Sequence, residues 1–453
     1  MSTPSAPTWP HPHPPELLGK ATRKSVVAAL EAHVAVSGGT PLRRALSEAL
    51  GRSRGLGGQE RRFTALAVRE LSRHLRLLDL ALKLLGHPPG KGLLIQDRAL
   101  LRMGIWRRLF CGAAADKIRA ELSLPGPLRP RTVDDSVVAE IVERPLPPFP
   151  QQALAVTQMA TRHSLPGWLA ERLAALLPQE DLDAAFGALN REAPIQLRVR
   201  PGVEPEGVRR ALAAEDVEVD PVEGLPDAWV VRGVGHRVFE TRPMRAGQLQ
   251  VQDVGSQLIV ALCGTPGELE GRGVADLCAG ARGKTLALAD RVGRGGRVYA
   301  ADASARRLAD ARDRVRRLGL RQVRFEPQVP LGEVTVALID APCSGVGSLS
   351  REPDVRWSLT PDRVTGLTRL QDRLLEETGR ALPSGGVMVY ATCSLFREEN
   401  EARVEAFLSG HPDFCLEPPG ARVPERFVTG DVLRVWPHQA PGGGFFAARL
   451  RRS

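Results

Sequence analysis

Two patterns of hydrophobic residues divide the chain. Up to residue 144, apolar side chains recur at spacings of three and four, which is the period of amphipathic helices. From residue 273 onward, short continuous apolar runs alternate with helical patterns, which predicts a doubly wound parallel sheet. The stretch between them contains short strand-like runs around one helical segment. The chain therefore predicts an all-α N-terminal domain, a small α/β module and a larger C-terminal α/β domain.

The N-terminal pattern predicts a helical bundle in which residues 59–85 form the longest helix. Several arginines of this helix form either an RNA-facing strip or the solvated face of the bundle, and the sequence leaves both interpretations open. The arginines are Arg61, Arg62, Arg69, Arg73 and Arg76. Helices are expected over Arg23–Val36, Gln59–Leu85, Ile95–Phe110 and Thr132–Arg144, with Thr132 as N-cap and Asp135 at N3.

Composition marks the boundaries between these parts. Residues 1–19 are rich in Pro and His and lack an apolar core, so we expect a disordered tail and no signal peptide. A Pro-rich run over 145–150 is typical of a linker. We expect domains over residues 20–150, 151–250 and 251–453. The middle part is expected to hold a helical connector from Ser164–Leu173, strands at Ile195–Val199, Val217–Val219 and Trp229–Val231, and a helix at Pro205–Ala214.

The C-terminal domain reads as a regular alternation of strands and helices. Its last strand follows a glycine-rich turn and is expected to be antiparallel to the others. The expected strands are Val274–Leu277, Arg297–Asp302, Arg321–Glu326, Val334–Asp340, Val387–Thr392 and Phe445–Leu450. The expected helices are Thr285–Val292, one from Ser304 to Leu318, one opening at Thr360–Pro361, and Arg397–Leu408.

Charge and cysteine content narrow the class of protein. A formal net charge of +10 favours a polyanionic partner such as nucleic acid, although nearly all of the 62 basic residues are arginine, which also fits a biased genome. The 6 cysteines include no CxxC pair, which argues against a disulfide framework or a zinc site. No apolar run of about 18 residues appears, so no membrane span is expected. We expect a cytoplasmic monomer.

Two of the predicted buried strands are each followed by a turn that contains a cysteine. Val336–Asp340 is followed by Cys343 in a Pro/Gly turn, and Val387–Thr392 is followed by Cys393. Ligands of open α/β sheets bind at the carboxyl ends of the strands, so these turns are expected to place both thiols in one pocket.

A cofactor site is predicted at the same edge. The turn Cys278–Lys284 follows the first strand, and Asp302 ends the second strand about 20 residues later, where such folds grip ribose hydroxyls. The turn lacks the spacing of a phosphate-binding loop. S-adenosylmethionine fits, because it presents ribose and adenine without a pyrophosphate.

Thiols, an acid and a sulfonium cofactor together indicate one chemistry. Carbon 5 of cytosine is a poor nucleophile until a thiolate adds to carbon 6. That addition needs a proton or a strong hydrogen bond at ring nitrogen 3, and Asp340 is placed to provide it.

The motifs resemble those of the RNA 5-methylcytosine methyltransferases of the Sun/NOL/NOP2 family. Its motifs I, IV and VI are similar to ADLCAG with GKT, to DAPCSGVG and to YATCS, and the resemblance covers nearly the whole chain. The matching segments are Ala275–Gly280 with Gly283–Thr285, Asp302, Asp340–Gly347, Tyr390–Ser394 with Glu398–Asn400, Gln252–Gln257 and Gly443–Phe446. The match points to the small-subunit ribosomal RNA branch. It implies a NusB-like, RNA-binding N-terminal domain and a Rossmann-like C-terminal domain with a seven-stranded, mostly parallel sheet.

The resemblance also implies a role for each site residue. Cys393 is the expected nucleophile, Cys343 the residue that assists product release, and Asp340 the partner of nitrogen 3 and a contact of the cofactor. Cys111, Cys263 and Cys415 are expected to be buried packing residues, and Cys278 to pack within the loop. Expected cofactor contacts are Cys278, Ala279, Gly280, Ala281, Arg282, Gly283, Lys284, Asp302, Gln328 and Asp340.

Two departures from the family keep alternatives open. Arg282 replaces a glycine of the family's loop, and Gln328 stands where an acid is expected near the adenine. The alternatives to an active RNA cytosine methyltransferase acting on 16S ribosomal RNA are the same chemistry on another RNA, a catalytically weakened ribosome-assembly factor, and a DNA cytosine methyltransferase. The last is disfavoured because such enzymes use the Pro-Cys thiol alone.

Overall fold

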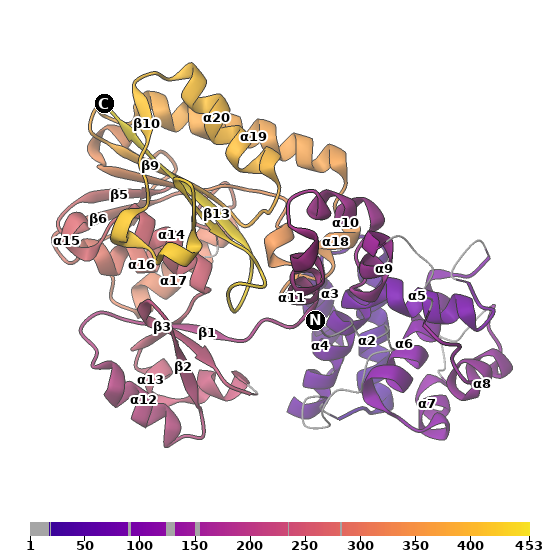
Figure 1. Cartoon of the computed structure of the whole chain (residues 1–453). Coiled ribbons are helices and arrows are strands. Elements are labelled where there is room, and N and C mark those ends of the chain that lie inside the picture. Colours follow the sequence, from indigo (N-terminus) through magenta and orange to yellow (C-terminus); the bar gives the residue numbers. More distant parts are fainter. Residues whose placement is uncertain are drawn as a thin grey trace. The chain divides into compact units, whose positions relative to one another are not determined.

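The computed structural model describes residues 18, 20–88, 92–123, 132–149, 155–233, 235–280 and 283–453. The chain divides into two compact units (Figure 1). The first consists of residues 1–190 and 352–358, and the second of residues 191–351 and 359–453. The predicted tail, apart from residue 18, and the end of the predicted linker at residue 150 lie outside the described residues.

The first unit is helical, as its sequence pattern predicts. Its core is built from leucine, alanine and aromatic side chains that include Phe63 and Trp106, whose rings lie 5.8 Å apart. Each fully buried side chain of this size stabilises the unit by about 1.5–3 kcal/mol. Its helices are α2 (Arg23–Ser37), α3 (Leu42–Arg52), α4 (Gly58–Arg73), α5 (Leu75–Leu84), α6 (Ile95–Cys111), α7 (Ala115–Leu122), α8 (Asp135–Glu143), α9 (Ala155–Arg162), α10 (Gly167–Ala174), η2 (Gln179–Asp181), α11 (Leu182–Asn190) and α18 (Val355–Ser358).

The prediction of one continuous helix over residues 59–85 is wrong, because the helix breaks at His74 between α4 and α5. In an unbroken helix, the backbone N–H of Arg76 would bond to the carbonyl of Ser72. Here the Arg76 N–H donates to Ser164 Oγ at 2.8 Å, and the Ser72 carbonyl accepts from Trp357 Nε1 at 2.6 Å. Both backbone groups are satisfied by residues distant in sequence, so the break leaves neither of them unpaired.

Two further details of this unit differ from expectation. Helix α8 begins at Asp135 and its N-cap is Asp134, which accepts from the N–H groups of Ser136 and Val137, so Thr132 is not the cap. The expected arginine strip is interrupted, because Arg73 is buried and paired with Glu70. An RNA-facing surface that includes Arg73 is therefore wrong.

The second unit begins with a small antiparallel sheet. Its four strands have the order β2-β3-β1-β4, and the last of them was not predicted. Helices α12 and α13 belong to the same module. The elements are β1 (Gln196–Val199), α12 (Pro205–Ala213), β2 (Val219–Val222), β3 (Leu225–Val231), η3 (Gly235–Glu240), α13 (Arg242–Arg245) and β4 (Leu249–Val251).

The remainder of the second unit is built on a large mixed sheet with the order β11-β12-β13-β9-β8-β5-β6-β7, and β10 pairs with β13. Within the described chain this sheet has nine strands, not the seven expected. Strands β9, β8, β5, β6 and β7 are parallel, whereas the ladders of β10 to β13 are antiparallel. The strands are β5 (Gly273–Asp276), β6 (Arg297–Ala300), β7 (Val323–Phe325), β8 (Val336–Asp340), β9 (Val387–Thr392), β10 (Phe414–Leu416), β11 (Val428–Thr429), β12 (Val432–Val435) and β13 (Phe445–Arg452).

Alternate residues of the parallel strands face two separate cores. Val274 and Leu338 belong to the core that helices α14 and α16 share, whereas Ala275 and Ile339 belong to the core beneath α19 and α20 (Figure 1). The helices are α14 (Val254–Cys263), α15 (Pro266–Leu269), α16 (Gly283–Val292), α17 (Ala305–Arg317), η4 (Leu331–Glu333), η5 (Val346–Ser348), α19 (Pro361–Ala381), η6 (Arg397–Glu399), α20 (Glu401–Gly410), η7 (Gly420–Arg422) and η8 (Glu425–Phe427).

The parallel part of the sheet reverses its strand order at β5, which lies between β8 and β6. Ligands bind at such switch points, at the carboxyl ends of the strands. The helical connector groups with the first unit and the small sheet with the second. The finer domain limits at residues 150 and 250 and the NusB likeness stay predictions. Among the described residues, no helix is long and apolar enough to cross a membrane.

Candidate active site

The turns after β8 and β9 bring two thiols together. Cys343 Sγ and Cys393 Sγ lie 3.4 Å apart, which is within hydrogen-bonding distance for sulfur. Their strands are parallel neighbours, with Asp340 beside Ala391 in register, so both turns leave the sheet at the same edge. The structure thus groups the two cysteines that the strand pattern placed in one pocket.

Close packing of three turns fixes the backbone beneath the thiols. Gly347 N donates to Cys393 O at 2.9 Å, and Gly444 N donates to Gly347 O at 2.8 Å. A Cβ at Gly347 would collide with the Gly444 backbone and lie 2.8 Å from Cys393 O. Glycine at position 347 is therefore required by close backbone approach.

Lys284 joins the cysteine turns to the cofactor loop. Its ammonium Nζ lies 2.8 Å from Asp340 Oδ2 and 3.2 Å from Ser256 Oγ. Burial works against the charged amine, but attraction to Asp340 prevails and raises the pKa of Lys284 above its usual value. A positive charge therefore lies beside the acid that the sequence assigned to nitrogen 3.

The two thiols differ in acidity. Hydrogen bonding to Cys393, burial and nearby negative charge raise the pKa of Cys343 well above its usual value. The same thiol–thiol hydrogen bond lowers the pKa of Cys393 and, with help from Ser348 and the charge of Lys284, outweighs burial and the Asp340 charge, which act in the opposite direction. Cys393 is therefore the thiol that ionises first, and a thiolate is the reactive form of cysteine.

The predicted ribose site lies at the end of β6. The carboxylate of Asp302 accepts from Ser304 N at 2.7 Å and lies 3.3 Å from Arg307 Nε. A Cβ at Gly280 would lie 2.9 Å from Asp302 Oδ2 and 2.7 Å from the Arg307 guanidinium. The side chains of Asp302 and Arg307 thus pack closely against Gly280, and this close approach requires glycine at position 280.

A second acid lies beneath the loop. Asp276 is buried and accepts from Thr285 Oγ1 at 2.6 Å, while its Oδ1 atom has no hydrogen-bond partner among the described residues. Burial raises the pKa of Asp276 to about 7. A buried oxygen without a partner fits a ligand with a cationic or hydrogen-bond-donating group, as S-adenosylmethionine has.

The structure describes only some of the other predicted cofactor contacts. Gln328 is exposed in the bend after β7, and Ala281 and Arg282 lie outside the described residues. Cys278 and Ala279 follow β5, and burial raises the pKa of Cys278 to about 12, which fits its expected packing role. Their contact with a cofactor stays a prediction.

The remaining cysteines only partly match the expectation of buried packing residues. Cys263 is buried and Cys111 is partly exposed, and burial raises the pKa of both thiols. Cys415 is exposed, so its assignment as a buried residue is wrong. It lies on β10, a short strand whose alternation the sequence pattern did not indicate.

Sequence reasoning missed the buried polar residues beneath the cysteines. Glu399 has no exposed surface and hydrogen-bonds both cysteine turns. The sequence did contain a signal for this cluster. A serine follows both Cys343 and Cys393, and the acidic pair Glu398–Glu399 comes shortly after Cys393. Ser256, which contacts Lys284, likewise had no assigned role.

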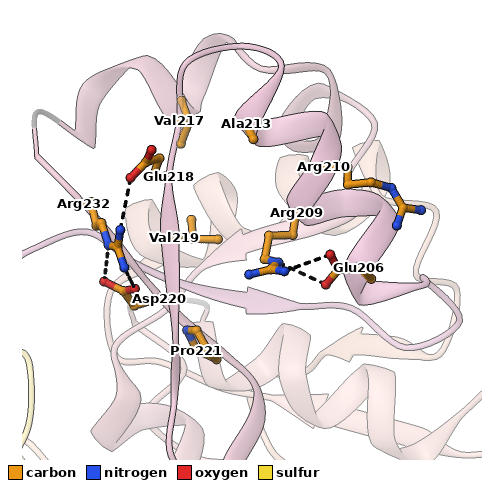
Figure 2. Close-up of a pocket in the computed structure, with 10 residues that line it drawn as sticks. All are labelled: Glu206, Arg209, Arg210, Ala213, Val217, Glu218, Val219, Asp220, Pro221 and Arg232. Carbon is orange, nitrogen blue, oxygen red and sulfur yellow. Dashed lines mark hydrogen bonds and ion pairs between the residues drawn. The ribbon is translucent and has the colours of Figure 1, made fainter.

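A separate pocket lies on the small antiparallel module, between α12 and the strands β2 and β3 (Figure 2). None of the predicted site residues lines it. Its arginines are paired: Arg232 with Asp220, and Arg209 with Glu206 at 2.9 Å. Paired arginines leave little net charge to bind a phosphate. Among the described residues, no cluster of His, Cys, Asp and Glu could hold a metal ion.

Comparison with known proteins relates the chain to ribosomal RNA methyltransferases. The sequence profile described as "16S rRNA methyltransferase RsmB/F" matches residues 265–451. The chain is 31% identical over 307 residues to the probable ribosomal RNA small subunit methyltransferase B of Synechocystis sp., covering 65% of this chain and 68% of that protein. It is 35% identical over 294 residues to ribosomal RNA small subunit methyltransferase B of Xylella fastidiosa, covering 63% and 68%.

Two crystal structures extend the likeness to the fold. That of PH0851 superposes with a TM-score of 0.77 at 25% identity, covering 96% of this chain and 99% of that one. A methyltransferase homolog protein from Pyrococcus horikoshii superposes with a TM-score of 0.56 at 26% identity, covering 66% of this chain and 100% of that one.

Proposed function

The chain belongs to the RsmB/F family of 16S rRNA methyltransferases, within the Sun/NOL/NOP2 group, and on this premise we propose that it methylates carbon 5 of a cytosine in 16S ribosomal RNA. S-adenosylmethionine is the methyl donor. The observation that carries this proposal is the pair of thiols 3.4 Å apart at the edge of the sheet where Asp340 also ends its strand.

The reaction begins at Cys393. Its lowered pKa provides a thiolate, which adds to carbon 6 of the cytosine and makes carbon 5 an enamine-like nucleophile. Cys343 keeps its proton, because hydrogen bonding, burial and negative neighbours raise its pKa. The structural difference between the thiols thus supports the same assignment as the family resemblance.

Nitrogen 3 of the ring gains a proton as Cys393 adds. Asp340 and Lys284 share this task, since the Lys284 ammonium lies 2.8 Å from the Asp340 carboxylate and carries the proton. A positioned donor of this kind typically contributes about 10²–10⁴ in rate. The proposal therefore adds Lys284 to the role expected of Asp340.

Product release reverses the addition. After methyl transfer, carbon 5 carries both a hydrogen and a methyl group. A water molecule acting as base takes the carbon 5 proton, the double bond between carbons 5 and 6 re-forms, and the Cys393 thiolate leaves. Nitrogen 3 then returns its proton to the Lys284–Asp340 pair. Cys343 assists this step, because its thiol proton is within hydrogen-bonding distance of the departing sulfur.

The chain's own residues fit the methyl donor. When bound, S-adenosylmethionine supplies an electrophilic methyl group. Asp302, just after β6, is placed to accept from ribose hydroxyls, and the buried Oδ1 atom of Asp276 has no hydrogen-bond partner among the described residues. Gly283 and Lys284 complete the loop at the start of α16.

The experiment combines the full-length chain with 16S ribosomal RNA and S-adenosylmethionine and maps methylated nucleosides by mass spectrometry. We expect 5-methylcytidine at one position, and no product from Cys393→Ala. Methylation of a base other than cytosine, or of cytosine outside carbon 5, would refute the proposal. RNA binding without any methyl transfer would favour the assembly-factor alternative.

A further inference from the structure

Each active-site cysteine is followed by a serine, and both serines bind the same carboxylate. Glu399 Oε1 accepts from Ser344 N at 2.8 Å, and Glu399 Oε2 accepts from Ser394 Oγ at 2.5 Å. The two serine hydroxyls also lie 3.1 Å apart. One side chain thus connects the turn of Cys343 with the turn of Cys393.

The carboxylate lies in an environment of neutral hydrogen-bond donors. Glu399 is fully buried, and within the described part of the chain no lysine or arginine forms an ion pair with it. Gln371 Nε2 lies 3.2 Å from its Oε1, and Tyr390 donates its hydroxyl to the Glu399 backbone carbonyl at 2.6 Å. Burying a carboxylate without a cation is unfavourable, so hydrogen bonds alone hold the charge in place.

Charge is distributed unequally around the two thiols. The Glu399 anion acts on Cys343, whereas the Lys284 cation acts on Cys393. The Asp340 carboxylate also acts on Cys393 and opposes Lys284, with which it pairs at 2.8 Å, so Cys393 has charged neighbours of both signs. The Arg403 and Asp372 pair, at 2.7 Å, lies further out beside Tyr390.

We propose that Glu399 is a positioning residue for the methyl-transfer reaction, holding the two thiols in register and assigning nucleophilic attack to Cys393. The role of Glu399 in catalysis rests on the proposed function. Its effect on the two thiols can be tested without RNA or methyl donor. The carboxylate reaches both cysteine turns at once, and its negative charge adds to the Cys393 hydrogen bond and the burial that keep the proton on Cys343. Neither thiol needs contact with Glu399, since the adjacent serines transmit its position.

The test measures alkylation of each thiol by iodoacetamide, with no RNA and no methyl donor present. The full-length protein is kept in a thiol-free reductant, and the modified peptides are quantified by mass spectrometry between pH 6 and pH 9. In the wild-type protein we expect Cys393 to react at least about tenfold faster than Cys343 near neutral pH, because the thiolate is the nucleophile.

Glu399→Gln keeps the size of the side chain and removes its charge. We expect the ratio of the Cys393 to the Cys343 alkylation rate to fall to about threefold or less. Cys343 should also begin to react at a lower pH than in the wild-type protein. Glu405→Gln is the matched control, because Glu405 is an exposed acid on α20 that pairs with Arg397. It should leave the ratio unchanged. An unchanged ratio in Glu399→Gln would overturn the proposal.

A second variant covers the case in which Glu399→Gln does not fold. Ser394→Ala retains the charge of Glu399 and removes the hydrogen bond from Ser394 Oγ to Glu399 Oε2. We expect it to lower the ratio of the Cys393 to the Cys343 alkylation rate as well. A wild-type ratio in Ser394→Ala would then overturn the positioning role. Failure of wild-type methylation would refute the proposed function instead, so the two failures are distinguishable.

Discussion

Lys284 Nζ lies 2.8 Å from Asp340 Oδ2, although the two residues follow different strands of the sheet. The sequence assigned Lys284 to the cofactor alone and Asp340 to both the cofactor and the base. Their ion pair joins the two sites, because the charge that a bound base meets at Asp340 depends on Lys284. A change at either residue should therefore affect chemistry more than RNA affinity.

Replacing Asp340 with Asn should lower the rate of methyl transfer about 10²–10⁴-fold and change RNA affinity by less than about threefold. The amide keeps the shape of the side chain but cannot hold the Lys284 ammonium as a carboxylate does. Single-turnover rates and filter binding would measure both effects. Asp313→Asn, at an exposed ion pair on α17, is the control. Near-normal turnover of Asp340→Asn would remove this residue from the mechanism.

The two cysteines should give opposite results on a denaturing gel. Cys393→Ala cannot form the adduct, so both adduct and product should be absent. Cys343→Ala should still attack but release slowly, so a protease-sensitive protein–RNA band should accumulate. Cys415→Ala, at an exposed cysteine, should behave as wild type. A trapped band from Cys393→Ala and none from Cys343→Ala would reverse the two roles.

Asp302→Ala should weaken S-adenosylmethionine binding by about 10–100-fold, because two hydroxyl hydrogen bonds to a charged acceptor would be lost. Arg307→Ala should change binding by less than about threefold. Its side chain is 59% exposed, and such surface pairs contribute only about 0–1 kcal/mol. Calorimetry on the full-length protein would compare the variants. Equal affinity of wild type and Asp302→Ala would place the ribose elsewhere.

Asp276 should make the stability of the protein without cofactor depend on pH. Burial raises the pKa of this carboxyl from 3.8 to about 7 in the folded state, so folding binds a proton between these values. Stability relative to Asp276→Asn should fall as pH rises from about 4 through about 7, by at most about 4 kcal/mol. The measurement is the difference in Tm between the two proteins at pH 5 and pH 8. A constant difference would show that Asp276 does not titrate in this range.

Removing residues 1–150 should weaken RNA binding more than cofactor binding, since the described cofactor residues all lie in the second unit. The deletion also removes Ser72, whose carbonyl accepts from Trp357 Nε1 at 2.6 Å. Trp357→Phe in the full chain separates this lost bond from the loss of helical surface. Wild-type RNA affinity in the deletion variant would refute an RNA-binding role for the helices.

The sequence alone predicted those helices and strands that are determined by residues close together in the chain. The apolar run Val387–Thr392 is the observed β9, Ser304 caps α17, and Thr360 with Pro361 opens α19. The thiol pair was also predictable, because carboxyl ends of parallel strands meet at one edge of a sheet. In each case the determinant is a local pattern or a general rule of the fold.

Contacts between distant residues decided the rest. The helix breaks at His74 because Ser164 and Trp357, far along the chain, satisfy its freed backbone groups. Likewise, Glu399 became a link between two turns only when β8 and β9 paired, and Lys284 met Asp340 only across the sheet edge. Periodicity records which face of an element is buried, but it carries no information about which distant hydrogen-bond partner arrives there.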